Sequence, residues 1–212
     1  PDLLKKKGIE DVDPFLKAYI EDHILPVYRE YEKAHNEDHI LKVIENSFVL
    51  IEDLDVNVDM VYTIAAYHDI GIVYGRKDHH LTSGKWMFED KKLLNWFTEQ
   101  ERKIMKEAIE DHRASRKEKP RSIYGCIVAE ADRDVDPERI VLRCVQYEAN
   151  AHPDETRDAR IIHIKKHLEE KYSQNGYLKL WMPSKKNEEG LRILREWMKS
   201  GEIDDVINKY LD

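Results

Sequence analysis

Apolar residues recur at helical spacing in several windows of the first half of the chain. The first window runs from Asp13 to Lys33, where Pro26 is suited to open a second helix. Asn36 then stands at an N-cap position, and the apolar stripe behind it predicts another helix. This stripe consists of Ile40, Val43, Ile44, Phe48 and Ile51. A third helix is predicted from about Asp59 to Asp69, with Gly71 ending it.

The same periodicity continues through the second half of the chain. Further helices are predicted over about 78–88, 98–112 and 122–133, and from Asp136 and Pro137 onward. Segments 139–145 and 159–164 are rich in β-branched residues, but each lies within a longer charged window of helical periodicity, so we interpret both as helical. Residues 174–187 carry the Gly, Pro and Asn residues of a loop, and two short helices are expected after it.

The composition supports this helical interpretation. Only 8 of the 212 residues are Gly, while 37% are charged, so turns are scarce and solvated helix faces are abundant. The length fits one large domain. We therefore expect an all-α fold with a single domain over residues 1–212, made of a core over about 15–173 and a helical extension over about 174–212.

The charge balance and the lack of long apolar segments exclude two classes of partner. The 35 Lys and Arg residues against 43 Asp and Glu residues give a formal net charge of −8, whereas a nucleic-acid-binding protein is normally basic. No uncharged apolar stretch approaches the roughly 18 residues of a membrane span, and the N-terminal segment lacks the apolar region of a signal peptide. Cys126 and Cys144 form no CxxC pair, which suits a reducing compartment. We expect a cytoplasmic protein without nucleic-acid or membrane partners, in an oligomeric state that the sequence leaves open, a dimer included.

Candidate chemistry lies at the ends of inward-facing helix stripes. His68 continues the apolar face of the third predicted helix, and Asp69 follows it directly, so an imidazole nitrogen and a carboxylate oxygen are able to approach one ion. An isolated His-Asp pair is more often a buried histidine or a helix cap than a metal site, so the pair by itself does not establish one. Asp132 ends a row of small and apolar residues, where a carboxylate needs a compensating partner, and a divalent cation is the simplest one. His39 lies beside the apolar stripe of its own helix.

The order of His39, His68 with Asp69, and Asp132 resembles the H…HD…D motif of the HD superfamily of metal-dependent phosphohydrolases. The contexts agree as well, because NEDH opens a helix at His39, AAYHDIG surrounds the central pair and AEADR surrounds the last aspartate. The resemblance covers about residues 15–170, and the chain is similar to a bacterial branch of small stand-alone HD proteins. It implies an all-α HD fold around a buried divalent metal site.

The resemblance implies that His39, His68, Asp69 and Asp132 are metal ligands. Two imidazoles and two carboxylates suit Mn²⁺, Fe²⁺, Co²⁺, Ni²⁺, Zn²⁺ or Mg²⁺ without selecting among them. Four protein ligands on an octahedral ion leave two positions, one for a water whose pKa is lowered and one for a phosphoryl oxygen.

His80 and His112 are further candidates. His112 ends an apolar row of its helix, and His80 is expected in the first turn of the helix over 78–88, with His79 at the surface. The resemblance places His80 and His112 in the active-site lining, as donors to a phosphate, as proton donors to the leaving group or as ligands of a second metal. Because only eleven positions separate Asp69 from His80, we expect one metal ion ahead of two.

Basic residues follow each candidate ligand segment. Lys77 follows the central pair, five basic residues lie within 113–121, and Arg133 adjoins Asp132. A locally positive rim would attract an anionic substrate, although a solvated loop has the same composition. We select Lys77, Arg113 and Arg133 as candidate substrate-binding residues.

The resemblance, together with these residues, implies an enzyme that hydrolyses a phosphoester or phosphoanhydride in a small, nucleotide-like phosphorylated substrate. Asp69 would orient and help to deprotonate the attacking water, and His80 or His112 would assist the leaving group. Two alternatives stay open: a di-iron HD-like oxygenase with His80 and His112 as extra ligands, and a non-catalytic nucleotide-binding sensor. The motif does not identify the substrate.

Overall fold

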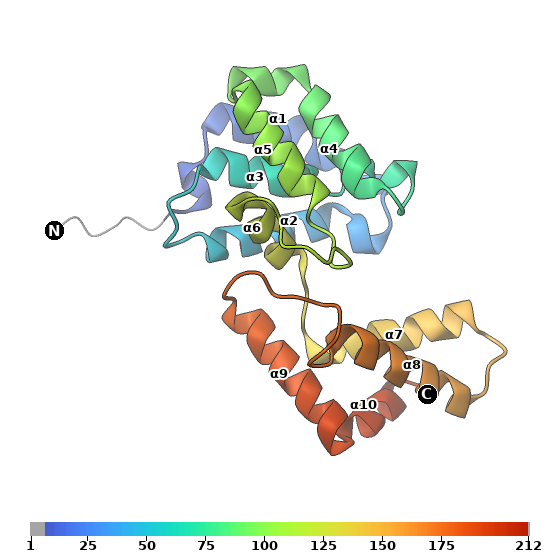
Figure 1. Cartoon of the computed structure of the whole chain (residues 1–212). Helices are drawn as coiled ribbons and strands as arrows, with labels where there is room; N and C mark the ends of the chain where they lie inside the picture. The colour runs from blue at the N-terminus through green and yellow to red at the C-terminus, as the bar shows by residue number, and fades with distance from the viewer. Residues whose placement is uncertain (1–6, 212) are drawn as a thin grey trace. The chain divides into compact units, whose positions relative to one another are not determined.

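The computed structural model of the chain, shown in Figure 1, describes residues 7–211. Over these residues the regular structure consists of α-helices and short 3-10 helices, with no strand, which confirms the all-α prediction. None of the helices described is both long enough and apolar enough to cross a membrane. The chain divides into two compact units, the first ending at Asp132 and the second beginning at Arg133.

The first unit is built around α3. Its α-helices are α1 (Pro14–His23), α2 (Glu37–Leu50), α3 (Val58–Tyr67), α4 (His79–Glu89), α5 (Glu99–Glu110) and α6 (Ile123–Asp132). Its 3-10 helices are η1 (Ile9–Asp11), η2 (Leu25–Glu30), η3 (Lys33–His35), η4 (Ile70–Tyr74) and η5 (Lys91–Asn95). Every residue from Met60 to Tyr67 is buried, and α2, α5 and α6 contact α3. A helix that is apolar on all sides must be enclosed in this way.

Local sequence signals set several helix starts as predicted. The Asn36 side chain accepts a hydrogen bond from the backbone N–H of His39 at 3.2 Å, and Thr98 opens α5 with a capping box. The window from Asp13 to Lys33 differs, because only α1 is α-helical there and Pro26 lies in the 3-10 helix η2. The tighter turn is held by tertiary contact, since the buried Tyr28 hydroxyl donates to the backbone oxygen of Ala66 at 2.7 Å.

The second unit contains α7 (Pro137–Ala151), α8 (Arg157–Tyr172), α9 (Lys185–Ser200) and α10 (Glu202–Tyr210). Within it, α7 packs against α8, α9 and α10. The segments 139–145 and 159–164 lie inside α7 and α8, so their helical interpretation is confirmed. The division between the compact units falls after Asp132 rather than near residue 173, and α7 and α8 belong with the C-terminal helices. That the whole chain is one domain stays a prediction.

Candidate metal centre

The His68-Asp69 pair lies where α3 ends. The helix predicted over 59–69 is too long, because α3 stops at Tyr67 and the two residues connect it to η4. Both residues are buried: His68 is completely inaccessible to solvent, and Asp69 is 3% exposed. A carboxylate this deep in a helical core needs compensating charge close by.

Four of the predicted ligands meet around this pair. One nitrogen or oxygen atom from each of His39, His68, Asp69 and Asp132 lies within 4.8 Å of the others. The Nε2 atom of His39 is 3.3 Å from Oδ2 of Asp69 and 3.0 Å from Oδ1 of Asp132. The Nε2 atom of His68 is 3.2 and 3.3 Å from the same two oxygens. We call these four residues the first cluster; they come from the start of α2, the end of α3 and the end of α6.

The other carboxylate oxygen of Asp69 faces a second cluster, formed with His79 and His112. The Oδ1 atom of Asp69 is 3.2 Å from Nε2 of His79 and 3.4 Å from Nε2 of His112. These two imidazole nitrogens are 3.3 Å apart, and the ligand atoms of the three residues again lie within 4.8 Å of one another. Asp69 therefore stands between two groups of ligands and offers one oxygen to each.

Three of the histidines are oriented in the same way. The Nδ1 atoms of His68, His79 and His112 lie 2.7, 2.9 and 2.5 Å from the backbone oxygen of the residue three positions earlier. Because a carbonyl oxygen only accepts, Nδ1 carries the hydrogen, and Nε2 of a neutral ring presents a lone pair. These lone pairs face carboxylate oxygens, and those of His79 and His112 also face each other. Divalent cations satisfy such a set of donors, and backbone-anchored Nδ1–H groups are typical of ligating histidines.

Without a cation, protons have to supply positive charge between the carboxylates. Burial disfavours the charged ring of His39, but hydrogen bonds to Asp132 and Asp69 outweigh burial and raise the pKa of His39 to about 9. The same balance raises the pKa of His68 well above its ordinary value. Although burial opposes it, the neighbouring imidazoles hold the pKa values of Asp69 and Asp132 far below the usual range. A bound cation would take the place of these protons.

The placement of His79 at the surface is wrong. His79 is the first residue of α4 and turns toward Asp69, whereas His80 belongs to neither cluster. The Nδ1 atom of His80 lies 3.0 Å from Nη1 of Arg113, and burial together with the Arg113 charge lowers the pKa of His80 to about 4. Adjacent helix positions point about 100° apart, so which histidine faces inward depends on how the chain enters α4, and this is not visible in the residue pattern.

A tight turn between Asp69 and α4 allows a histidine at the start of α4 to reach Asp69 despite the short sequence separation. This separation was the reason for expecting one metal ion rather than two. The backbone N–H of Gly71 in η4 donates to Oγ of Ser83 at 2.8 Å, and a Cβ on Gly71 would collide with the hydroxyl of Thr82 and the backbone of Ser83. Gly75 then adopts φ 119° and ψ 149°, a conformation that only glycine adopts readily. The chain reverses there and returns to Asp69 with His79 at the start of α4.

The predicted substrate-binding residues have different surroundings. Lys77 and Arg113 are neighbours, because the Arg113 guanidinium donates to the backbone oxygen of Lys77. Arg121, from the same basic loop, instead holds the two carboxylate oxygens of buried Asp111 at 3.0 and 2.9 Å and so anchors the loop. Arg133 has a buried side chain, 8% exposed. Phosphate binding by Lys77, Arg113 and Arg133 stays a prediction.

His35 lies beside both clusters, although the H…HD…D order does not include it. Its ring centroid is 6.3 Å from that of His39 and 6.1 Å from that of His79. Its Nδ1 atom is 3.0 Å from Oε1 of Glu32, which also accepts a hydrogen bond from Arg76 at 2.6 Å. The spacing of four residues from His39 was the available signal, but it was ambiguous because His35 precedes the helix in which His39 lies.

The part of the chain that matches a known family contains all the residues of both clusters. Residues 36–134 match the model of the HD domain, a shorter span than the 15–170 expected from the motif contexts. No curated protein sequence matches the chain. The chain is similar to the crystal structure of a predicted HD superfamily hydrolase from an uncultured Thermotogales bacterium, with a TM-score of 0.53 and 15% identity over 95% of this chain and 96% of that chain. At this identity the likeness shows a shared fold.

Proposed function

We propose that this chain is a metal-dependent hydrolase of a phosphoester or phosphoanhydride in a small, nucleotide-like substrate. Residues 36–134 match the HD domain and hold the clustered histidine and aspartate side chains. The observation that carries the proposal is the position of Asp69, whose two oxygens face two separate pairs of imidazole nitrogens at 3.2 to 3.4 Å. Divalent ions bound there would polarise a phosphoryl oxygen and lower the pKa of a water.

Side chains around the two clusters have separate roles in the proposed reaction. Asp69 orients the attacking water and helps to remove its proton, because its carboxylate is central to both clusters. Arg113 and Lys77, which adjoin one another, neutralise phosphate oxygens as charge develops. His80, whose pKa is lowered to about 4, is neutral at pH 7, so it accepts a hydrogen bond from Arg113 and orients the guanidinium rather than donating a proton to the leaving group.

We propose two metal ions rather than one. The first cluster supplies His39, His68, Asp132 and one oxygen of Asp69, and the second supplies His79, His112 and the other oxygen. Three protein ligands leave coordination positions for water and substrate on the second ion. His112 is then a ligand and not a proton donor.

Elemental analysis of protein purified without chelators tests this directly. We expect about two transition-metal ions per chain, and hydrolysis of p-nitrophenyl phosphate or of members of a nucleotide panel that stops on chelation and returns with the metal. A protein that neither retains nor rebinds metal would contradict the assignment of both clusters.

The second cluster also favours one rival, a di-iron oxygenase, because that chemistry needs two adjacent ions. Two irons per chain with oxygen consumption and no phosphate release would select the oxygenase. Tight nucleotide binding without turnover, whichever metal is supplied, would instead select a sensor.

A further inference from the structure

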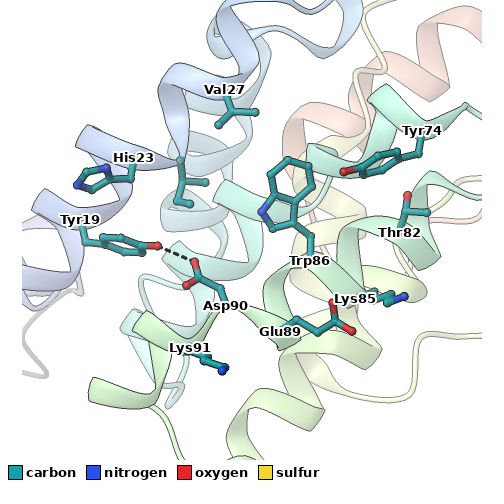
Figure 2. Close-up of a pocket in the computed structure, with 11 residues that line it drawn as sticks. Tyr19, His23, Val27, Tyr74, Thr82, Lys85, Trp86, Glu89, Asp90 and Lys91 are labelled. Carbon is teal, nitrogen blue, oxygen red and sulfur yellow. Dashed lines mark hydrogen bonds between the residues drawn. The ribbon is translucent and has the colours of Figure 1, made fainter.

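A cavity of about 740 Å³ lies in the first unit, lined by residues of α1, η2, η4, α4 and the start of η5 (Figure 2). None of the residues of the two clusters lines it. Along α4 the lining residues begin one turn beyond His79. Trp86 is seven residues beyond His79, which corresponds to about 10 Å at the rise of an α-helix. The volume falls in the range of pockets that hold small organic ligands.

Aromatic side chains form two sides of the cavity. The indole of Trp86 and the ring of Tyr74 have centroids 6.0 Å apart, with planes inclined by 47°. Across the cavity, Tyr19 stacks on Trp96 at 6.0 Å and 25°. Figure 2 shows Trp86 projecting into the space between Tyr74 and the Tyr19–Asp90 side. Aromatic faces presented from two sides suit a planar ring.

The Tyr19 side is held in place before any ligand arrives. The hydroxyls of Tyr19 and Tyr67 both donate to Oδ2 of Asp90, at 2.7 and 2.6 Å. The other oxygen, Oδ1, accepts the backbone N–H of Lys92 at 3.0 Å. Both oxygens of Asp90 therefore accept hydrogen bonds. Because these bonds already hold Tyr19 in place, little conformational entropy is lost on this side of the cavity when a ligand binds.

Two cationic and two acidic side chains line the cavity, and its lysines are the groups available to an anion. Lys85 and Lys91 both line it and are exposed, and neither forms an ion pair with any carboxylate in residues 7–211. Glu89 and Asp90 are the acidic lining residues, and Asp90 keeps its negative charge although both of its oxygens accept hydrogen bonds. An anionic group of a ligand would therefore pair with the two lysines, which have no acidic partner among the described residues.

We propose that this cavity binds a planar aromatic molecule that carries one negatively charged group, at a site separate from the metal centre. The ring lies against Trp86 and Tyr19, and the anionic group lies near Lys85 and Lys91. Because none of the cluster residues lines the cavity, we assign the ligand as a second molecule, and removal of the metal in the test below distinguishes it from an extension of the phosphorylated substrate.

The test uses two fluorescent probes with the same rings. One is 8-anilinonaphthalene-1-sulfonate, and the other is N-phenyl-1-naphthylamine, which lacks the sulfonate. Both are titrated against the native protein, Trp86→Ala, Trp86→Phe and the double variant Lys85→Ala/Lys91→Ala. Lys92→Ala is the matched control, because Lys92 is exposed beside Lys91 and does not line the cavity. Circular dichroism verifies that each variant is folded.

We expect Trp86→Ala to weaken both probes about tenfold and Trp86→Phe to restore most of the affinity, because the stacking face is lost and then replaced. The double lysine variant should weaken the sulfonate probe about fivefold relative to the uncharged probe, and Lys92→Ala should not. Removing metal with a chelator should leave both affinities unchanged. Sulfonate binding that is unaffected by Trp86→Ala, a probe ratio that the lysines do not alter, or binding abolished by chelation would each overturn the proposal.

Discussion

The two clusters on either side of Asp69 differ in charge and in how the chain brings their ligands together. The first contains two carboxylates and two imidazoles, whereas the second has two imidazoles and only the shared carboxylate. The ligands of the first lie at the ends of α2, α3 and α6. In the second, His79 depends on the reversal at Gly75. The first cluster has more negative charge, and its ligands are placed by helix ends, so it should bind a cation with higher affinity than the second cluster. We therefore expect the ion of the first cluster to stay bound and the ion of the second to exchange.

The largest expected effect comes from removing the shared residue. Asp69→Ala deletes the oxygen that faces each cluster, so both ions should be lost and hydrolysis should fall by at least about 10³-fold, with helical content unchanged. Metal content per chain and turnover with saturating metal measure this. Asp78→Ala is the control, since Asp78 is exposed near the site and its side chain makes no cap hydrogen bond. Full turnover in metal-replete Asp69→Ala would refute the assignment.

Single-cluster variants separate the two sites. His79→Ala should remove about one ion per chain and lower turnover about 10²-fold while the first ion stays bound. His80→Ala is the matched neighbour and should leave both ions in place, because its ring contacts Arg113 and not Asp69. If His80→Ala loses an ion and His79→Ala does not, the placement of the two histidines at the start of α4 is reversed.

These two histidines also mark how far the sequence predicts the site. The first cluster follows from the H…HD…D order, because its ligands lie at or next to helix ends whose apolar stripes are legible in the residue pattern. The inward position of His79 does not, because it depends on a turn whose direction only Gly75 permits. Arg121 is one of the basic residues within 113–121 that predicted a positive rim, but its guanidinium forms an ion pair with buried Asp111. The number of charged residues in the segment does not reveal this partner.

The fold shows the same division. Periodicity predicted the helices through segments 139–145 and 159–164, because their charged flanks continue the helical pattern. It did not predict that the chain beyond α1 would form 3-10 turns, since the contact of Tyr28 with Ala66 joins residues 38 positions apart. Tertiary contacts of this kind leave no local signal.

The proton balance of the first cluster predicts opposite pH trends for stability and for metal affinity. The pKa of His39 is raised from 6.5 to about 9, so in metal-free protein its stabilisation is complete below pH 6.5 and is lost as the pH rises through 9. The loss amounts to at most about 3 kcal/mol. Metal affinity should rise over the same range, by up to about tenfold per pH unit for one displaced proton.

Thermal melts of chelator-treated protein and metal titrations between pH 6.5 and 9 measure the two trends. His39→Gln should reduce both slopes, because it removes one titrating ring, while the raised pKa of His68 preserves part of the pH dependence of metal binding. A melting temperature of metal-free protein that increases with pH over this range would contradict the predicted sign.

The smallest expected effect tests the reversal that delivers His79. At φ 119° and ψ 149° a side chain on Gly75 is strained, so Gly75→Ala should cost about 1 to 2 kcal/mol of unfolding free energy. No atom lies near the added methyl group, so the cost comes from the backbone. Because the first cluster does not use this turn, the variant should weaken the second ion and leave the first unchanged in a metal titration. Val73→Ala, at an exposed position in η4, is the control. Equal weakening of both ions in Gly75→Ala would mean that the two clusters form one cooperative unit and that their comparison as separate sites fails.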